Sequence, residues 1–251
     1  MNHHPYYRNR PGANSAVLLI HGILSTPRHF DWIIPHIPEE YEIRNILLAG
    51  HGGTVKDFSK ANMTQWKTQV ENELVDLEKH FSNVYMICHS LGTLLALQEV
   101  KSHACIRGLI LLNIPLKPFL SFSMIGRSIR FAFGKIRAND PMDLRCYNDL
   151  GVTLHPYLWK YICWIPNFLS LIKLARKCRP LPATLNIPCY AYFCKNDEVV
   201  RPRSAKYLKN NPNITVTLLE SGTHFYYPSD EKSKILHGLD IILNNMNNKS
   251  S

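Results

Sequence analysis

Three residues far apart in the chain carry the functional groups that nucleophilic catalysis needs: Ser90, Asp197 and His224. A serine hydroxyl is a weak nucleophile until a neighbouring base takes its proton, and an acid beside that base fixes its tautomer. We therefore predict Ser90 as the nucleophile, His224 as the general base and Asp197 as the acid that orients it. Glu198 adjoins Asp197 and is the alternative acid.

The surroundings of these residues favour the prediction more than their types do. A serine between a strand and a helix is most often a helix cap, an aspartate after a strand often forms a turn, and a loop histidine is usually solvated. Here Ser90 follows the apolar run 84–88, Asp197 follows 188–194 and His224 follows 214–219. The carboxyl ends of parallel strands meet at one edge of a sheet, so the three side chains are expected to lie together.

Nucleophilic catalysis of this kind also requires a pair of backbone N–H groups that face the developing oxyanion. The residue after the nucleophile supplies one in a strand-to-helix turn, which predicts the amide of Leu91. The other is expected from the loop that begins at His21-Gly22, where glycine permits a backbone bend. We predict Ile23 as this donor, with Leu24 as the alternative; the other reading is that His21-Gly22 merely ends a strand.

Short apolar runs alternate with longer amphipathic ones along most of the chain. Strands are predicted at 16–20, 41–48, 84–88, 109–113, 188–194 and 214–219, and helices at 27–35, 63–81, 91–102, 203–208 and 230–246. This alternation is typical of an α/β fold with a mostly parallel, doubly wound sheet that has helices on both faces. Residues 116–182 interrupt the pattern, and the polar tail 244–251 is expected to fray.

At this point the chain resembles the α/β-hydrolase family, and within it the small carboxylesterase and monoacylglycerol-lipase-like branch. The motifs that carry the likeness are Leu19-Ile-His-Gly-Ile23, Leu48-Ala-Gly-His-Gly-Gly-Thr54, Cys88-His-Ser-Leu-Gly92, Asn196-Asp-Glu-Val-Val200 and Ser221-Gly-Thr-His224. Their order, nucleophile then acid then histidine, is that of the family. The resemblance implies Ser90, Asp197 and His224 as the triad and Ile23 and Leu91 as the oxyanion amides. It also implies a helical cap at 116–182, inserted into a core made of 1–115 and 183–251.

The 116–182 segment differs from the rest of the chain in composition. It holds eleven Lys and Arg against three Asp and Glu, which is +8 of the net charge of +10, and ten aromatic residues. The plainer interpretation is a small lid whose apolar side packs on the core and whose cations are solvated. The sharper hypothesis is an acyl pocket with a basic face that meets an anionic membrane surface. Nucleic-acid binding is not expected, because no recognisable module accompanies the charge.

Other features narrow the function classes. The seven cysteines show no metal-binding spacing, and Cys88, Cys189 and Cys194 lie in apolar runs, where reduced buried thiols are expected. No apolar stretch is long enough to span a membrane and no signal peptide precedes the first strand, so a cytoplasmic protein is expected. We expect a serine hydrolase of carboxylic esters that needs no cofactor or metal. A thioesterase, amidase or acyltransferase, and a catalytically silent binding protein, are the alternatives.

Overall fold

The computed structural model describes residues 3–244. Its strands form one large sheet and a two-residue pair. The large sheet contains β1 (Tyr6–Arg8), β2 (Ser15–Ile20), β3 (Glu42–Ile46), β5 (Asn83–His89), β6 (Ile106–Leu112), β8 (Cys189–Cys194) and β9 (Ile214–Leu219). The pair contains β4 (Gly53–Thr54) and β7 (Val152–Thr153). The predicted strands are all present, and the last of them has the predicted bounds.

The large sheet has the order β1-β3-β2-β5-β6-β8-β9. Every neighbouring pair runs parallel except β1 with β3, which is antiparallel. The predicted α/β class and the mostly parallel sheet are therefore confirmed. The edge strand β1 was not predicted, because only three residues form it and none of them is buried.

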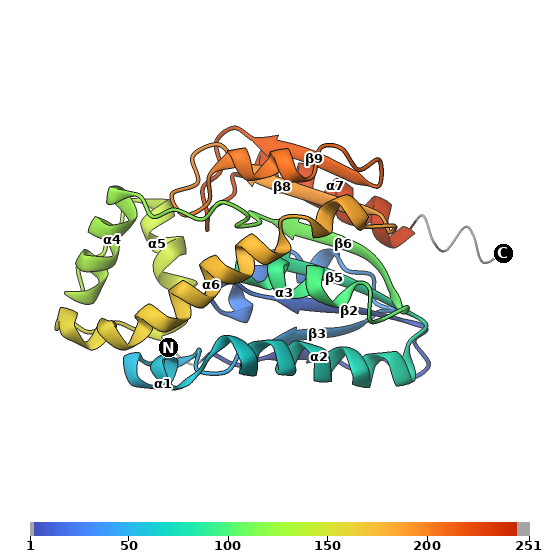
Figure 1. Ribbon diagram of the computed structural model, residues 1–251, viewed down its shortest axis with the longest axis horizontal. Helices are drawn as coiled ribbons and strands as arrows, with labels where there is room; N and C mark the ends of the chain where they lie inside the picture. The colour runs from blue at the N-terminus through green and yellow to red at the C-terminus, as the bar shows by residue number, and fades with distance from the viewer. Residues whose placement is uncertain (1–2, 245–251) are drawn as a thin grey trace.

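Helices cover both faces of the sheet (Figure 1). The helices are α1 (Val55–Lys60), α2 (Met63–His80), α3 (Leu91–Glu99), α4 (Phe122–Ala132), α5 (Pro141–Asn148), α6 (Ile165–Cys178) and α7 (Ser229–Asn244). Alternate strand residues such as Leu18 and Leu19 enter different cores, since successive side chains of a strand point to opposite faces. One core packs against α2, α3 and α6, and the other packs against α7.

Two predicted helices take a tighter form. Residues 27–35 form two 3₁₀ helices, η1 (Pro27–Phe30) and η2 (Ile34–His36), instead of one α-helix. Pro35 lies in the second of them and lacks the N–H that a continuous helix needs. The predicted helix at 203–208 is the 3₁₀ helix η5 (Pro202–Tyr207). The predicted end of the last helix, Met246, and the tail from 245 lie outside the described residues.

The segment 116–182 contains α4, α5, β7, η3 (Leu158–Trp164), α6 and η4 (Leu181–Thr184). Helices α4 and α5 lie at one end of the molecule, and α6 runs from that end back along the sheet (Figure 1). The later part of α6 joins the core, where Leu171, Leu174 and Cys178 are buried. In the part of the chain that the structure describes, no helix is long and apolar enough to cross a membrane.

Candidate active site

Ser90 occupies a sharp turn between β5 and α3. Its backbone has φ 49° and ψ −117°, a conformation that residues other than glycine rarely adopt. The Ser90 N–H donates to the carbonyl of Leu112 at 2.9 Å, which ties the turn to β6. A Cβ atom added at Gly92 would lie 2.1 Å from the Ile20 carbonyl oxygen. Glycine is therefore required there for α3 to approach β2 closely enough to form the turn.

His224 lies between Ser90 and Asp197. Its Nε2 is 3.1 Å from Ser90 Oγ, and its Nδ1 is 2.8 Å from Asp197 Oδ2. Both partner side chains and the imidazole are buried. Asp197 Oδ1 also accepts hydrogen bonds from the backbone N–H groups of Val199 and Val200, each at 2.7 Å. The structure thus brings the three predicted residues into one hydrogen-bonded chain with the acid held in a single orientation.

Glu198, the alternative acid, points elsewhere. Its Oε1 accepts from Arg127 Nη1 at 2.7 Å, and its Oε2 accepts from the backbone N–H of His224 at 3.4 Å. It therefore contacts the peptide of His224, while Asp197 contacts the imidazole. This geometry favours Asp197 as the residue that orients the imidazole.

The two candidate oxyanion amides have no hydrogen-bond partner among residues 3–244. Leu91 is the first residue of α3, so its N–H has no partner within the helix. Ile23 lies in the loop after β2, and its N–H donates to no group among residues 3–244. The alternative, Leu24, is engaged, because its N–H donates to His51 Nε2 at 3.1 Å.

Buried histidines support this loop. His51 Nδ1 lies 3.1 Å from the Leu48 carbonyl, and its Nε2 accepts from Leu24, so the ring is neutral and donates from Nδ1. Burial lowers the pKa of His51 to about 4. His21 Nε2 accepts from the Leu48 N–H at 3.0 Å, and burial lowers its pKa well below the usual value. These contacts give His51 a structural role in the loop.

Asn113 is a buried contact of the site that sequence reasoning missed. It follows β6 with φ 52°, and its Nδ2 donates to the carbonyls of Thr223 and His224 at 3.3 and 3.2 Å. Its Oδ1 accepts from the N–H of Cys194. Asn113 therefore joins the ends of β6 and β8 to the loop that carries His224. The sequence offered no distinct signal for it, because Asn113 is the last residue of the strand predicted at 109–113.

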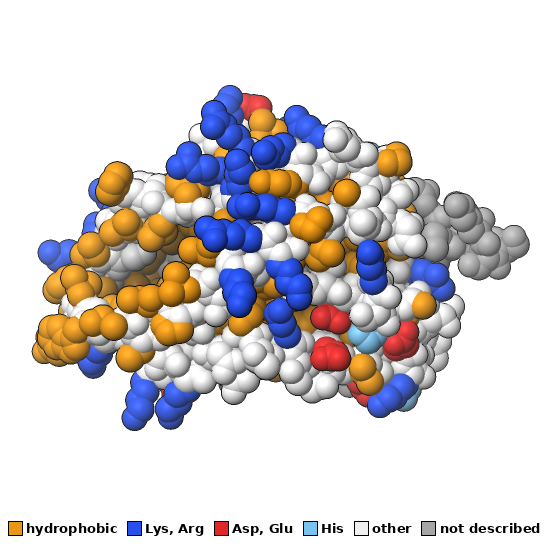
Figure 2. Space-filling model, in the orientation of Figure 1, with side chains coloured by type: hydrophobic (Ala, Val, Ile, Leu, Met, Phe, Trp, Pro, Cys, Tyr) orange, Lys and Arg blue, Asp and Glu red, His pale blue; other side chains and the backbone are white. Residues whose placement is uncertain are grey.

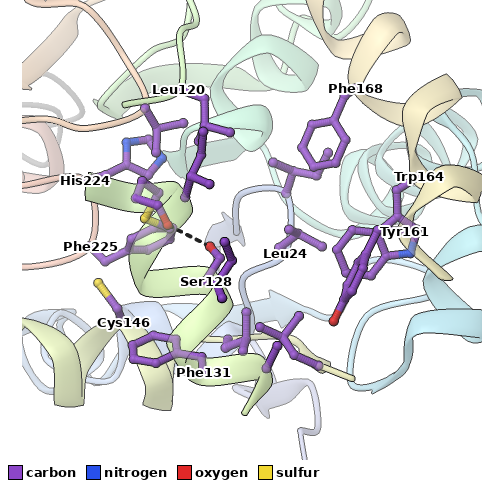
Figure 3. Close-up of a pocket in the computed structure, with 18 of the residues that line it drawn as sticks. Leu24, Leu120, Ser128, Phe131, Cys146, Tyr161, Trp164, Phe168, His224 and Phe225 are labelled. Carbon is purple, nitrogen blue, oxygen red and sulfur yellow. Dashed lines mark hydrogen bonds between the residues drawn. The ribbon is translucent and has the colours of Figure 1, made fainter. Parts of the chain in front are cut away.

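A cavity of about 420 Å³ opens beside His224. Figure 3 shows Leu24, Phe131, Tyr161, Trp164 and Phe168 around it, with His224 and Phe225 at one side. Its walls are almost entirely apolar, and Ser128, a polar exception, donates its hydroxyl to the Met124 carbonyl. A cavity of this kind has room for an apolar group. His224, one of its lining residues, places Nε2 3.1 Å from Ser90 Oγ.

Within residues 3–244, the cysteines and the acidic residues give no indication of a thiol nucleophile or a metal site. The seven thiols are free, and Cys88, Cys189 and Cys194 are buried as predicted. Burial raises the pKa of the Cys88 thiol well above its usual value. Among residues 3–244, no three His, Cys, Asp or Glu side chains are grouped to hold a metal ion.

Comparison with known proteins identifies the family. Residues 17–233 match the Alpha/beta hydrolase family, and the chain belongs to it. No curated protein sequence matches the chain.

Solved structures of the same fold are distant in sequence. One comes from work on LipS and LipT, two metagenome-derived lipolytic enzymes. It has a TM-score of 0.71 and 17% identity over 95% of this chain and 96% of that chain. A monoacylglycerol lipase of Paleococcus ferrophilus has a TM-score of 0.66 and 14% identity over 96% and 98%. The thioesterase domain from the curacin biosynthetic pathway has a TM-score of 0.59 and 15% identity over 94% and 98%. At this identity the likeness establishes the fold.

Proposed function

We propose that the protein hydrolyses carboxylic esters through an acyl-enzyme intermediate. The observation that carries the proposal is the hydrogen-bonded chain Ser90–His224–Asp197 at the edge of an apolar cavity. Ser90 Oγ attacks the ester carbonyl carbon while His224 Nε2 takes its proton. Asp197 holds the Nδ1–H tautomer and stabilises the imidazolium that results.

The rest of the reaction uses the neighbouring backbone and the same base. The N–H groups of Ile23 and Leu91 stabilise the oxyanion of the tetrahedral intermediate. When the intermediate collapses, the C–O bond to the leaving alcohol breaks and the alcohol receives the proton from His224. Water then attacks the acyl group on Ser90, again with His224 as base, and releases the carboxylic acid. In this proposal residues 116–182 form the cap, and the apolar cavity accepts the acyl chain.

The test is turnover of para-nitrophenyl esters of increasing chain length by the protein and by Ser90→Ala. We expect turnover that is lost in Ser90→Ala, rises with chain length and stops rising when the cavity is filled. A fluorophosphonate probe provides a second readout, because covalent labelling at Ser90 requires an activated hydroxyl. Absence of both turnover and labelling would leave a catalytically silent fold that only binds ligands.

The same triad also serves thioesters, amides and acyl transfer. The thioesterase domain among the structural neighbours makes the thioester the first alternative to test. Oxyester and thioester substrates with the same acyl chain separate the two reactions. A preference for the thioester would identify the protein as a thioesterase. An added alcohol that increases acyl-enzyme turnover and forms a new ester would identify a transferase.

The surface of the 116–182 segment supports the proposal that the protein meets its substrate at a membrane. Figure 2 shows apolar side chains around the hollow at the α4 end of the molecule, with Lys and Arg beside them. Large apolar side chains exposed there are Phe122, Leu158, Trp159, Ile162, Ile165 and Leu169. Exposed cations in the same segment that form no ion pair within residues 3–244 are Lys135, Arg137, Lys160, Lys173, Arg176 and Lys177. This combination fits an anionic bilayer, in which apolar side chains insert and cations meet head groups.

Vesicle sedimentation tests the membrane contact. Phe122 is 93% exposed and Trp159 63% exposed, so replacing both by serine leaves the core intact. We expect the wild-type protein to sediment with anionic vesicles more than with zwitterionic ones, and the double variant to lose this. Leu218→Ser, an exposed apolar site on β9, is the matched control and should bind like the wild-type protein. Equal sedimentation of all three proteins would exclude this surface.

A further inference from the structure

The backbone N–H and carbonyl of His224, like its imidazole, are hydrogen-bonded to side chains. Its N–H donates to Glu198 Oε2 at 3.4 Å. Its carbonyl oxygen accepts from His89 Nε2 at 2.9 Å and from Asn113 Nδ2 at 3.2 Å. All of these groups are buried. The position of the imidazole relative to Ser90 therefore depends on Glu198, His89 and Asn113.

The contact on the N–H side leads to helix α4. Arg127, which is buried in α4, donates from Nη1 to Glu198 Oε1 at 2.7 Å and from Nε to Asp143 Oδ1 at 2.8 Å. Arg130 pairs with the same aspartate. Other side chains of α4, including Ser128 and Phe131, line the cavity. One helix therefore both forms a cavity wall and holds the carboxylate that contacts the His224 peptide.

The contact on the carbonyl side leads to the end of helix α5. The His89 ring stacks on His29, with ring centres 3.9 Å apart and an angle of 21° between the planes. His29 Nδ1 lies 2.9 Å from Oδ2 of Asp149, the residue that caps α5, and Arg145 pairs with the same carboxylate. Burial lowers the pKa of both histidines, so each ring is neutral and has a single N–H. His29 directs its N–H at Asp149, and His89 directs its N–H at the His224 carbonyl.

We infer that Arg127 and Asp149, both in the 116–182 segment, are positioning residues for His224: Arg127 acts through Glu198 on its backbone N–H, and Asp149 acts through His29 and His89 on its carbonyl. The inference rests on the proposed function, in which His224 is the base. An acyl chain in the cavity packs against the helix that carries Arg127, so filling the cavity and aligning the base are linked. Removing one member of a buried ion pair leaves the other without compensation, and the backbone around it must shift. Displacements of about 1 Å at a reacting group cost roughly a hundredfold in rate.

The test separates alignment of the base from binding of the acyl chain. The probe is a fluorophosphonate with a single short alkyl chain, which reacts with Ser90 without filling the cavity. Its second-order labelling rate is measured for the wild-type protein, Arg127→Met and Asp149→Asn. We expect about a tenfold or larger fall in labelling rate for both variants, and a similar fall in kcat for a short ester with little change in KM.

Two control variants make a merely structural effect visible. Ile129→Ala changes the cavity wall on the same helix, so it should raise KM for a long-chain ester more than it lowers the rate of labelling by the short probe. Arg44→Met removes a half-buried arginine that pairs with Glu73 and Asp76, remote from His224 in contacts, and should change neither quantity. Thermal melting of every variant records any loss of folding.

Each outcome bears on the inference. Labelling within twofold of wild type in folded Arg127→Met and Asp149→Asn overturns it. If Arg127→Met does not fold, Arg127→Lys takes its place: it keeps the charge, but one ammonium group cannot reproduce the planar fork between Glu198 and Asp143. Reduced labelling at an unchanged melting temperature then supports the inference, and unchanged labelling overturns it. Wild-type protein that is not labelled at all refutes the proposed function itself, before any variant is compared.

Discussion

The sheet and the 116–182 segment use apolar side chains in opposite ways. In β2, residues 16–20 are completely buried. In the segment, the buried face of α6 joins the core, but many other apolar side chains line a cavity or face solvent. Within residues 3–244, the only large exposed apolar side chains outside the segment are Tyr6, Tyr7, Val75 and Leu218. Apolar surface that folding leaves exposed is available for binding, so changes in the sheet should affect stability and changes in the segment should affect ligands.

The two regions also bury different polar groups. The sheet side of the site buries neutral imidazoles, with His21, His51 and His89 held by backbone contacts. The segment buries charged groups, with Arg127 against Asp143 and Glu198. Neutral groups with backbone partners make a rigid support, while a buried ion pair is sensitive to the loss of either member. The neutral histidines therefore give the candidate site a rigid support on the side of the sheet. On the side of the 116–182 segment, the support depends on the ion pairs of Arg127.

The largest expected effect lies at the carboxyl edge of the sheet. Asp197→Asn keeps the size of the side chain but cannot stabilise an imidazolium or fix the Nδ1–H tautomer. We expect kcat for para-nitrophenyl esters to fall by about 10⁴-fold with an unchanged melting temperature. Steady-state kinetics and thermal melting are the measurements. A fall of less than tenfold would show that another acid serves His224.

Gly92→Ala should be the strongest test of packing in the sheet region. The added Cβ would lie 2.1 Å from the Ile20 carbonyl oxygen and 2.9 Å from that of His21, both backbone atoms that cannot move aside alone. We expect the free energy of unfolding to fall by about 3 kcal/mol, at the upper end of overpacking effects. Urea unfolding followed by circular dichroism measures it. An unchanged midpoint would mean that α3 and β2 can separate at little cost.

Clear local patterns in the sequence explain why most of the fold could be predicted. The strand predicted at 214–219 has those bounds in the structure, and the helix predicted at 63–81 ends one residue earlier, at His80. Such elements can be recognised in the sequence by an apolar run or by apolar residues with a 3.6-residue period. Strand β1 lacks that signal, because its pairing with β3 and not its own burial defines it. Residues 27–35 carry apolar side chains at helical spacing, but Pro35 interrupts the hydrogen bonds that a single helix needs.

The candidate site was predictable where it follows strand ends and not where distant elements meet. Ser90, Asp197 and His224 each follow a recognisable strand, and the structure brings them within hydrogen-bonding distance. The contact of Arg127 with Glu198 joins residues 71 positions apart, and no local pattern indicates it. Asn113 depends on a positive φ that becomes visible only in three dimensions. Contacts of this kind arise from packing between elements, which a single sequence does not report.

Because the sheet side of the site buries neutral imidazoles, we expect the stability of the protein to depend on pH. Burial lowers the pKa of His51 from 6.5 to about 4, so below pH 6.5 the unfolded chain binds a proton that the folded chain does not. Its contribution to stability is complete above pH 6.5 and is lost as the pH falls toward 4. From pH 7 to pH 5 this group alone should lower the free energy of unfolding by about 2 kcal/mol.

Urea unfolding at the two pH values measures this loss. His51→Gln keeps a donor and an acceptor but cannot be protonated, so its stability should depend less on pH than that of the wild-type protein. His155→Gln, at a half-buried position in the segment, is the control and should keep the wild-type dependence. If His51→Gln also keeps it, other groups, such as His21 and His89, carry the effect.

The smallest expected effect has the opposite sign and lies in the segment. Gly126 is in the interior of α4, and a Cβ added there would have no atom within 4 Å. Gly126→Ala therefore restricts the unfolded chain without a clash, and we expect it to stabilise the protein by about 0.5–1 kcal/mol with ester turnover unchanged. The same substitution at Gly92 destabilises, so measuring both in urea compares the two regions directly. If Gly126→Ala also destabilises, α4 is packed as closely as the sheet, and the contrast between a filled core and an open segment is wrong.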